Sequence, residues 1–191
     1  MPASRSPLET LAVPTTHPLW AVNLATDFGD PLTIIDAAVN TATARALVER
    51  ALKERGRSLS EVARVIVTHP HPRHLGLAGW IQTRSGAAVF LLERDWRWPW
   101  EESERTEQQA TYLREHGLPE RWIAAISGEQ EEIRGQVAPL GQVSWLRPGQ
   151  TLALGGSTYL VLALPGHEDG HLGLWCPERR FAVLGDVLGP G

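Results

Sequence analysis

The stretch "VIVTHPHPRHLGLAGW", residues 65–80, decides the fold of this chain and raises the question of its function. It opens on the end of a β-branched run, residues 64–68, which predicts a short buried strand. Three histidines follow where the chain leaves that strand: His69, His71 and His74. Neutral imidazoles bind zinc, iron, copper and nickel, so this loop is a candidate metal site. Arg73, whose guanidinium cannot lose its charge, stands directly before the third histidine.

Strands and helices are predicted on both sides of that loop. Residues 20–36 predict two strands joined by a Gly-Asp-Pro turn, which indicates a hairpin. Residues 40–56 carry apolar side chains on one helical stripe, with Asn40 as the expected N-cap and Gly56 just past the end. Residues 75–92 predict a helix followed by a strand. The succession of strand, loop, helix and strand is typical of the α/β class.

A helical insert and a set of short strands are predicted later in the chain. The insert is expected at about residues 93–134, as two helices broken by "HGLPE" at residues 116–120. From residue 143 onward the sequence predicts short strands separated by turns.

Three tryptophans crowd the start of the insert: Trp96, Trp98 and Trp100. We interpret them as hydrophobic residues that pack the insert. The alternative is an aromatic wall over the metal that selects an apolar or acyl substrate. The sequence does not decide between the two.

The composition predicts one compact domain that acts on a small molecule. The chain has 191 residues and a net charge of -4, which argues against nucleic acid and anionic membranes as partners. We expect a domain over residues 20–191 preceded by an extension, residues 1–19. Cys176 is the only cysteine, which fits a reducing compartment. Because neither an export signal nor a long apolar run is evident, we expect a cytoplasmic protein.

Two further loops at strand ends carry residues that could join the histidine cluster. "LPGHEDGH" offers His167 and His171, and "VLGD" offers Asp186. In layered α/β folds the loops at strand ends converge on one rim, so a third ligand is expected there. We expect His167 to be a turn or supporting residue rather than a ligand. His17 and His116 are expected to be surface residues.

Three motifs in this order resemble those of the metallo-β-lactamase superfamily. The first, His-x-His-x-Asp-His, is matched by residues 69–74, with Arg73 at the position of the aspartate. The second, Pro-Gly-His-x-x-Gly-His, is matched by residues 165–171. The third, Gly-Asp after a strand, is matched by residues 185–186. The similarity covers roughly residues 20–187, and the ordered set is far more specific than any one motif.

The resemblance implies an α/β fold of the αββα type, with two mixed sheets face to face and helices outside. It also implies that Asp36 stands at the family's Asp-x-Gly position, where Ala38 replaces the glycine. The expected ligands of a first metal are His69, His71 and His171, with Asp186 beside it. A second metal normally uses the missing aspartate, His74, Asp186 and a later histidine. Because the chain stops at Gly191, the sandwich is expected to be incomplete at its C-terminus, and a homodimer could cover that edge.

Arg73 is the residue that argues against a second metal. A guanidinium at 4 Å from a cation is repelled by about 4 kcal/mol per unit charge at an effective dielectric constant near 20. We therefore expect one zinc ion per chain, with iron as the alternative metal. We interpret Arg73 as a fixed charge that orients a substrate carboxylate or steadies an oxyanion. The rival interpretation is that the lost ligands mark a chain that no longer catalyses.

Taken together, the residues and the resemblance predict a hydrolase. In this enzyme, metal-activated water would attack an ester or thioester carbonyl, and Asp186 would orient that water. β-Lactam cleavage is a weaker expectation, because no export signal accompanies the site. Two alternatives remain open: a catalytically inactive binding or regulatory module, and a mononuclear iron oxidoreductase on the same fold.

Overall fold

The computed structural model describes residues 8–14, 21–93 and 103–188. Trp96, Trp98 and Trp100 lie outside these residues, as does His17. The predictions made for them are therefore not tested by the structure.

Six strands form the first sheet in the order β1-β2-β3-β4-β5-β6. Their bounds are Glu9–Pro14 (β1), Ala21–Asp27 (β2), Thr33–Ile35 (β3), Arg64–Ile66 (β4), Ala88–Leu92 (β5) and Val143–Leu146 (β6). The pairs β1·β2 and β2·β3 are antiparallel, whereas β3 to β6 run parallel. Parallel neighbours need long crossover connections, and the helices of the chain lie in these connections. The hairpin predicted over residues 20–36 is confirmed as β2 and β3.

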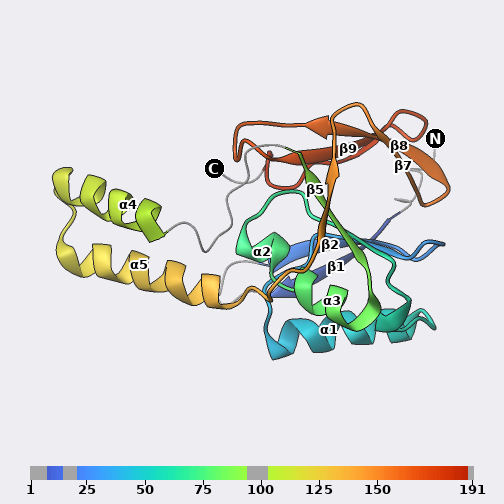
Figure 1. Cartoon of the computed structure of the whole chain (residues 1–191), viewed down its shortest axis with the longest axis horizontal. Coiled ribbons are helices and arrows are strands. Elements are labelled where there is room, and N and C mark those ends of the chain that lie inside the picture. Colours follow the sequence, from blue (N-terminus) through green and yellow to red (C-terminus); the bar gives the residue numbers. More distant parts are fainter. Residues whose placement is uncertain (1–7, 15–20, 94–102, 189–191) are drawn as a thin grey trace.

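Four antiparallel strands form the second sheet in the order β10-β9-β8-β7. They are Thr151–Leu154 (β7), Ser157–Ala163 (β8), Leu172–Cys176 (β9) and Phe181–Val183 (β10). The second sheet is antiparallel throughout these strands, whereas the resemblance implied two mixed sheets. Figure 1 shows this sheet, the six-stranded sheet and the helices α1 (Ala42–Glu54) and α3 (Ala78–Ser85) as successive layers.

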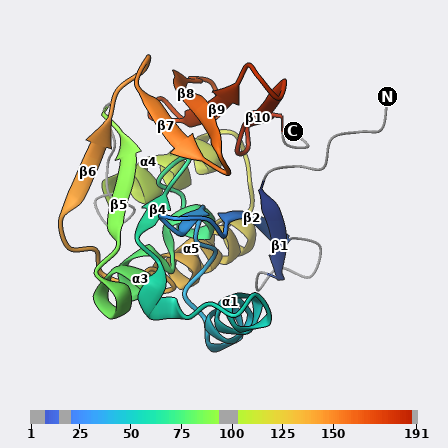
Figure 2. The ribbon, with the colours of Figure 1, turned by 90° about the vertical axis from the view of Figure 1, so that its right-hand side faces the viewer.

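Neighbouring residues on the strands of the first sheet point into two different cores, because side chains alternate along a strand. Ile34 belongs to the core under the helices, and Ile35 to the core between the two sheets. The same alternation separates Val65 from Ile66 and Leu91 from Leu92. Burial on both faces explains why these strands are continuously apolar in sequence. Figure 2 shows the sheet from another side, with β6 and β1 at opposite borders.

Helix α1 covers the first sheet through Ala44, Val48 and Leu52, all of which are buried. Its N-cap is Thr41, whose side-chain oxygen accepts a hydrogen bond from Ala44 N at 3.1 Å. The expected cap, Asn40, instead accepts a hydrogen bond from Arg45 Nε at 2.8 Å. The assignment of Asn40 as the cap was therefore wrong by one residue.

Part of the segment expected to precede the domain supplies the edge strand β1. Val13 of this strand is fully buried, and Glu9 forms an ion pair with Arg55 at the end of α1. The sheet thus begins earlier in the chain than residue 20.

The predicted insert forms a pair of helices, α4 (Ser103–Glu115) and α5 (Glu120–Gly135), that project from one end of the sandwich (Figure 1). His116 is exposed between them, as expected. The chain returns from α5 beside the histidine loop: Asn40 N donates to Gln136 O at 2.7 Å, and Ala138 N donates to Gly76 O at 2.8 Å. The insert is therefore anchored next to that loop. Every helix within the described ranges is too short or too polar to span a lipid bilayer.

Candidate metal centre

The predicted site residues meet at one rim of the sandwich, where strands β3, β4, β8 and β10 end. Asp36 follows β3, and His69 and His71 follow β4. His74 lies on α2 (Pro72–Leu75), a short helix that begins directly after His71. The β8–β9 loop carries His167 and His171, and Asp186 follows β10. The sequence prediction that these loops converge is confirmed by the contacts between them.

A buried carboxylate ties the first two of these loops together. Asp36 Oδ1 accepts hydrogen bonds from Thr68 N at 2.8 Å and from Thr68 Oγ1 at 2.9 Å. Its Oδ2 lies 2.9 Å from Nδ1 of His74. Leu172 N in turn donates to Thr68 O at 2.6 Å, which joins the β8–β9 loop to the same point. The loop positions are therefore fixed by hydrogen bonds between strand ends.

Three imidazoles from two loops form the first donor group, which we call the imidazole group: His69, His71 and His167. His69 Nε2 lies 3.1 Å from His71 Nδ1, and His167 Nε2 lies 3.2 Å from the same atom. All three nitrogens are within 4.8 Å of one another. That spacing allows one ion to contact all three.

A second donor group shares His69 with the first, and we call it the carboxylate group: His69, His74 and Asp186. Asp186 Oδ2 lies 3.3 Å from His74 Nε2 and 3.9 Å from His69 Nε2. The same oxygen is 3.9 Å from Nε2 of His167. Asp186 of the carboxylate group therefore also lies near His167 of the imidazole group.

Each imidazole that follows β4 has a hydrogen-bond partner on its far nitrogen. His69 Nδ1 lies 3.1 Å from Thr68 Oγ1, and His71 Nε2 lies 2.7 Å from Glu168 Oε1. Partners of this kind fix the orientation and tautomer of metal-binding histidines. Glu168 therefore positions His71 in the way that Asp36 positions His74.

His171 is buried beside these groups and belongs to neither. Its ring stacks on His69 with centroids 4.8 Å apart, and its Nε2 accepts a hydrogen bond from Asp186 N at 3.2 Å. Its Nδ1 is buried and has no hydrogen-bond partner among the described residues. Gly185 allows the backbone before Asp186 to approach the His171 ring, because a Cβ at Gly185 would lie 2.6 Å from His171 Cε1.

Burial and charge divide the imidazoles into two kinds. Burial, joined by the neighbouring imidazoles, lowers the pKa of His69 well below its ordinary value. Burial also lowers the pKa of His71, against the opposing effect of Glu168, and that of His171. Burial alone would lower the pKa of His74 too, but Asp36 and Asp186 outweigh it and raise it to about 9. Neutral imidazole is the form that binds metal.

Asp186 is ionised in this setting. Its hydrogen bond with His74 lowers its pKa to about 2, and the charge of Arg73 on α2 acts in the same direction. Arg73 stands where the family motif has an aspartate, and because it is partly buried, solvent screens its charge less than that of an exposed arginine.

The donor set fits a divalent transition metal. Three neutral imidazole nitrogens and one carboxylate oxygen are ligands suited to zinc, and iron also accepts them. The far nitrogens of His69 and His71 are held by Thr68 and Glu168, which metal-binding histidines require. The residues present therefore fit the metal that the motifs imply.

The structure brings together all the predicted metal ligands and adds two residues to them. His69, His71, His74 and Asp186 lie within the two groups, and His171 touches both His69 and Asp186. His167 was expected to be a supporting residue, yet its nitrogen joins the imidazole group. Glu168 was not singled out, and the signal that could have found it is its place beside His167 in a loop with two histidines.

A model of the "Metallo-beta-lactamase superfamily" matches residues 24–191. A probable metallo-hydrolase of Bacillus subtilis is 26% identical over 184 residues, covering 93% of this chain and 56% of that protein. A hydroxyacylglutathione hydrolase of Haemophilus influenzae is 27% identical over 128 residues, covering 66% of this chain and 50% of that protein. The chain thus spans about half the length of these relatives.

A solved structure indicates the same family as the relatives found by sequence. A metallo-beta-lactamase family protein from Thermus thermophilus is 32% identical, with a TM-score of 0.80 over 94% of this chain and 58% of its own. A beta-lactamase domain protein from Burkholderia ambifaria has a TM-score of 0.70 at 23% identity over 91% of this chain and 52% of its own, which indicates the shared fold.

Proposed function

The chain belongs to the metallo-β-lactamase superfamily of metallo-hydrolases, and we propose that it holds one zinc ion and cleaves an ester or thioester of a small molecule. The observation that carries this proposal is the convergence of His69, His71 and Asp186 with the histidines of the β8–β9 loop. Three relatives are named hydroxyacylglutathione hydrolases, and an acylglutathione is a thioester, which supports a carbonyl of this type as the target.

His69 and His71 would hold the ion together with an imidazole of the β8–β9 loop, with Asp186 beside it. When bound, such an ion lowers the pKa of a coordinated water toward about 7 and polarises a carbonyl. The imidazoles meet it as neutral donors because burial keeps the pKa of His69 and His71 low. Burial of His69 also keeps bulk water from that side of the site.

Asp186 orients the attacking water in this proposal. Its carboxylate is ionised, because the pKa is about 2, so Oδ2 accepts a hydrogen bond from the water over the working pH range. His74 holds the carboxylate in place through the 3.3 Å contact of its Nε2. A carboxylate fixed from one side keeps one lone pair directed toward the reacting centre.

Arg73 supplies the positive charge that a second metal ion supplies in the family's two-metal pattern. Its charge helps the histidines to lower the pKa of Asp186, so it lies within electrostatic range of that carboxylate. A guanidinium there would meet the oxyanion of the attacked carbonyl, or a carboxylate carried by the substrate. It would also disfavour a second divalent ion by about 4 kcal/mol per unit charge at 4 Å and an effective dielectric constant near 20. These arguments support one ion.

The compartment proposed for this enzyme is the cytoplasm. The single cysteine, Cys176, is buried and free, which fits a reducing compartment.

The test is hydrolysis by the purified full chain loaded with one equivalent of zinc. Acylglutathione thioesters, aryl esters and a chromogenic β-lactam are compared at equal concentration, with His69→Ala as the negative control. The proposal expects the thioester or ester to be cleaved faster than the β-lactam, and cleavage to require His69. Zinc-loaded chain that cleaves neither an ester nor a thioester contradicts it. Iron bound in place of zinc, with oxygen consumption, would favour the oxidoreductase.

A further inference from the structure

We propose that the helical hairpin α4–α5 is a dimerisation arm, which binds a second copy of this chain through its tip, residues 112–122. In the proposed contact, Arg121 and Trp122 of each copy dock on the outer face of α4 of the other. The proposal is independent of the metal chemistry. It places the homodimer contact on the hairpin rather than at the C-terminal edge of the sandwich.

The hairpin reaches away from the sandwich (Figure 1). Helix α4 packs on α5, and α5 meets the rest of the chain beside the short helix α2. Ala110 of α4 and Ile123 of α5 are buried, as an apolar seam between the two helices requires. The outer surface of the hairpin therefore faces away from the other described elements over most of its length, and it is accessible to a partner.

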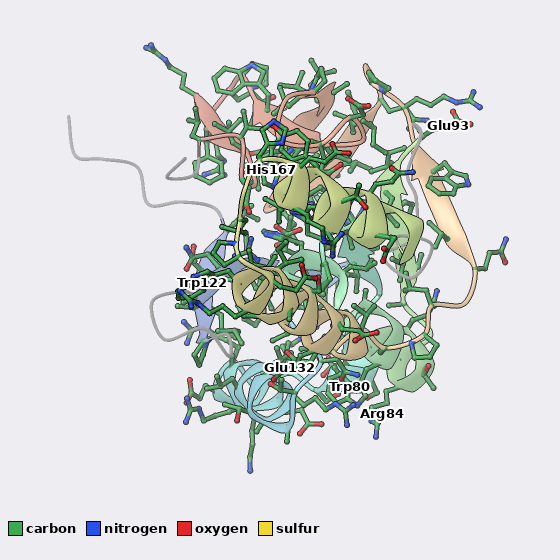
Figure 3. The ribbon with its side chains drawn as sticks, turned by 90° about the vertical axis from the view of Figure 1, so that its left-hand side faces the viewer. Trp80, Arg84, Glu93, Trp122, Glu132 and His167 are labelled. Carbon is green, nitrogen blue, oxygen red and sulfur yellow. The ribbon has the colours of Figure 1, made fainter. Side chains whose placement is uncertain are left out.

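Two large aromatic side chains are exposed near the tip. Tyr112 is 58% exposed and Trp122 is 55% exposed. Each lies within about one turn of the end of its helix, where α4 connects to α5. Figure 3 shows Trp122 at the start of α5, on the end of the hairpin that faces the viewer. Tryptophan and tyrosine are enriched in protein–protein interfaces, so the tip carries the anchors that an interface needs.

Helix α4 carries an open hollow beside one of these aromatic residues. The hollow has a volume of about 430 Å³ and is lined along one face of α4 by Glu107, Gln108, Thr111, Tyr112 and Glu115. Within the described part of the chain, neither of the two glutamates forms an ion pair. The hollow thus joins an aromatic wall to two carboxylates, which suits a partner that combines an apolar ring with a positive charge.

Arg121 and Trp122 together have those properties. The Arg121 guanidinium lies over the Trp122 ring, with its carbon 5.9 Å from the ring centroid. Among the described side chains no carboxylate pairs with Arg121, whereas the nearby Arg114 is held by Glu120 at 2.7 Å. Within the described residues, the tip thus carries an unpaired positive charge, opposite in sign to the glutamates of the hollow.

A second copy of the chain is the partner that uses all of these features at once. In a two-fold dimer every contact occurs twice, so Arg121 of each copy meets Glu115 of the other. The indole of Trp122 enters the hollow in the same contact, and buried tryptophan and arginine side chains carry much of the binding energy of interfaces. A basic peptide would fill the hollow and leave Arg121 and Trp122 in water. The complementary charges therefore favour the second copy.

Sedimentation velocity of the full chain, measured over a series of protein concentrations, tests the proposal. Arg121→Glu and Glu115→Arg each place like charges opposite one another, so either variant alone should raise the dimer dissociation constant at least about tenfold. An equimolar mixture of the two variants restores both charge pairs in the heterodimer, and it should dimerise nearly as well as the unmodified chain. Arg50→Glu, a charge reversal at an exposed position of α1, is the matched control and should leave the constant unchanged.

Trp122→Ala should also weaken the dimer at least about tenfold, which is the loss typical of an interface tryptophan. Zinc binding should be the same in all of these variants, because the tip lies away from the metal centre. Thermal unfolding verifies that each variant is folded. A chain that stays monomeric at every concentration overturns the proposal, as does a dimer that Arg121→Glu and Glu115→Arg leave unchanged. A mixture of the two variants that stays monomeric overturns the pairing of these charges.

Discussion

The imidazole group and the carboxylate group share His69 and differ in charge. In the imidazole group, burial lowers the pKa of His69 and His71, so neutral nitrogens face one another. In the carboxylate group, His74 lies between Asp36 and Asp186 with its pKa raised to about 9, and the charge of Arg73 acts on the same aspartate. The first group thus gathers neutral donors suited to a cation, whereas the second has its negative charge balanced by side chains. This difference supports the proposal that ion pairs take the place of a second metal in the carboxylate group.

Replacing His69, which both groups share, should have the largest effect on zinc binding. His69→Ala takes a ligand from both groups, so zinc binding should fall at least about 100-fold and hydrolysis should be lost. The measurement is a zinc titration of the variant beside His116→Ala, which should bind zinc like the unmodified chain. Zinc binding that survives in His69→Ala would show that the two groups are not linked through this residue.

Replacing Arg73 by an acidic residue should turn the carboxylate group into a second metal site. Arg73→Asp restores the carboxylate of the family motif, so we expect a second, weaker equivalent of zinc to bind beside Asp186 and His74. Arg73→Leu removes the charge and adds no ligand, and it should stay at one equivalent. Elemental analysis after dialysis counts the ions. If Arg73→Asp leaves both metal content and activity unchanged, Arg73 has no part in the centre.

Crowding the backbone next to His171 should disturb both groups. Gly185 has a φ of 53°, and a Cβ there would lie 2.6 Å from His171 Cε1 and 2.9 Å from Thr68 Oγ1. Gly185→Ala should therefore lower the free energy of unfolding by about 2–4 kcal/mol, from left-handed strain together with overpacking. Gly56→Ala has a similar φ, 67°, and open space around it, so it should cost only about 1 kcal/mol. Equal losses in the two variants, measured by urea unfolding, would contradict the packing argument.

Loosening one supporting contact should give the smallest effect. Glu168→Gln keeps the size of the side chain and removes the charge that holds His71 Nε2 at 2.7 Å. We expect the zinc dissociation constant to rise about tenfold. Asp169→Asn, the neighbouring substitution in the same loop, should change it little. Comparable effects of the two substitutions would mean that loop charge in general, and not the contact with His71, controls the affinity.

Most of the fold could be predicted because its signals are local. The β-branched run before His69, the apolar stripe of α1 and the turns around β2 and β3 each determine their own element. The N-cap is Thr41 rather than Asn40, and both residue types can cap a helix. The choice depends on Arg45, whose Nε donates a hydrogen bond to the Asn40 side chain. β1 was missed because its pairing with β2 is set by tertiary contacts.

The site could be predicted only in part. Motif spacing identified His69, His71, His74 and Asp186, which lie together. The motif spacing assigned His171 as the ligand and His167 as a supporting residue, whereas the approach of the His167 ring to His69 and His71 depends on how the β8–β9 loop turns over the end of β4. The role of Glu168 depends on a contact across 97 residues of sequence, which no local pattern reveals.

The central claim is that one half of the centre binds a metal and the other half is closed by Arg73 and its ion pairs. Counting the ions bound to the purified, unmodified full chain tests this claim most directly. After zinc loading and dialysis, elemental analysis should find one equivalent per chain. Two equivalents would contradict the replacement of the second ion by Arg73, and no bound metal would contradict the hydrolase proposed from this centre.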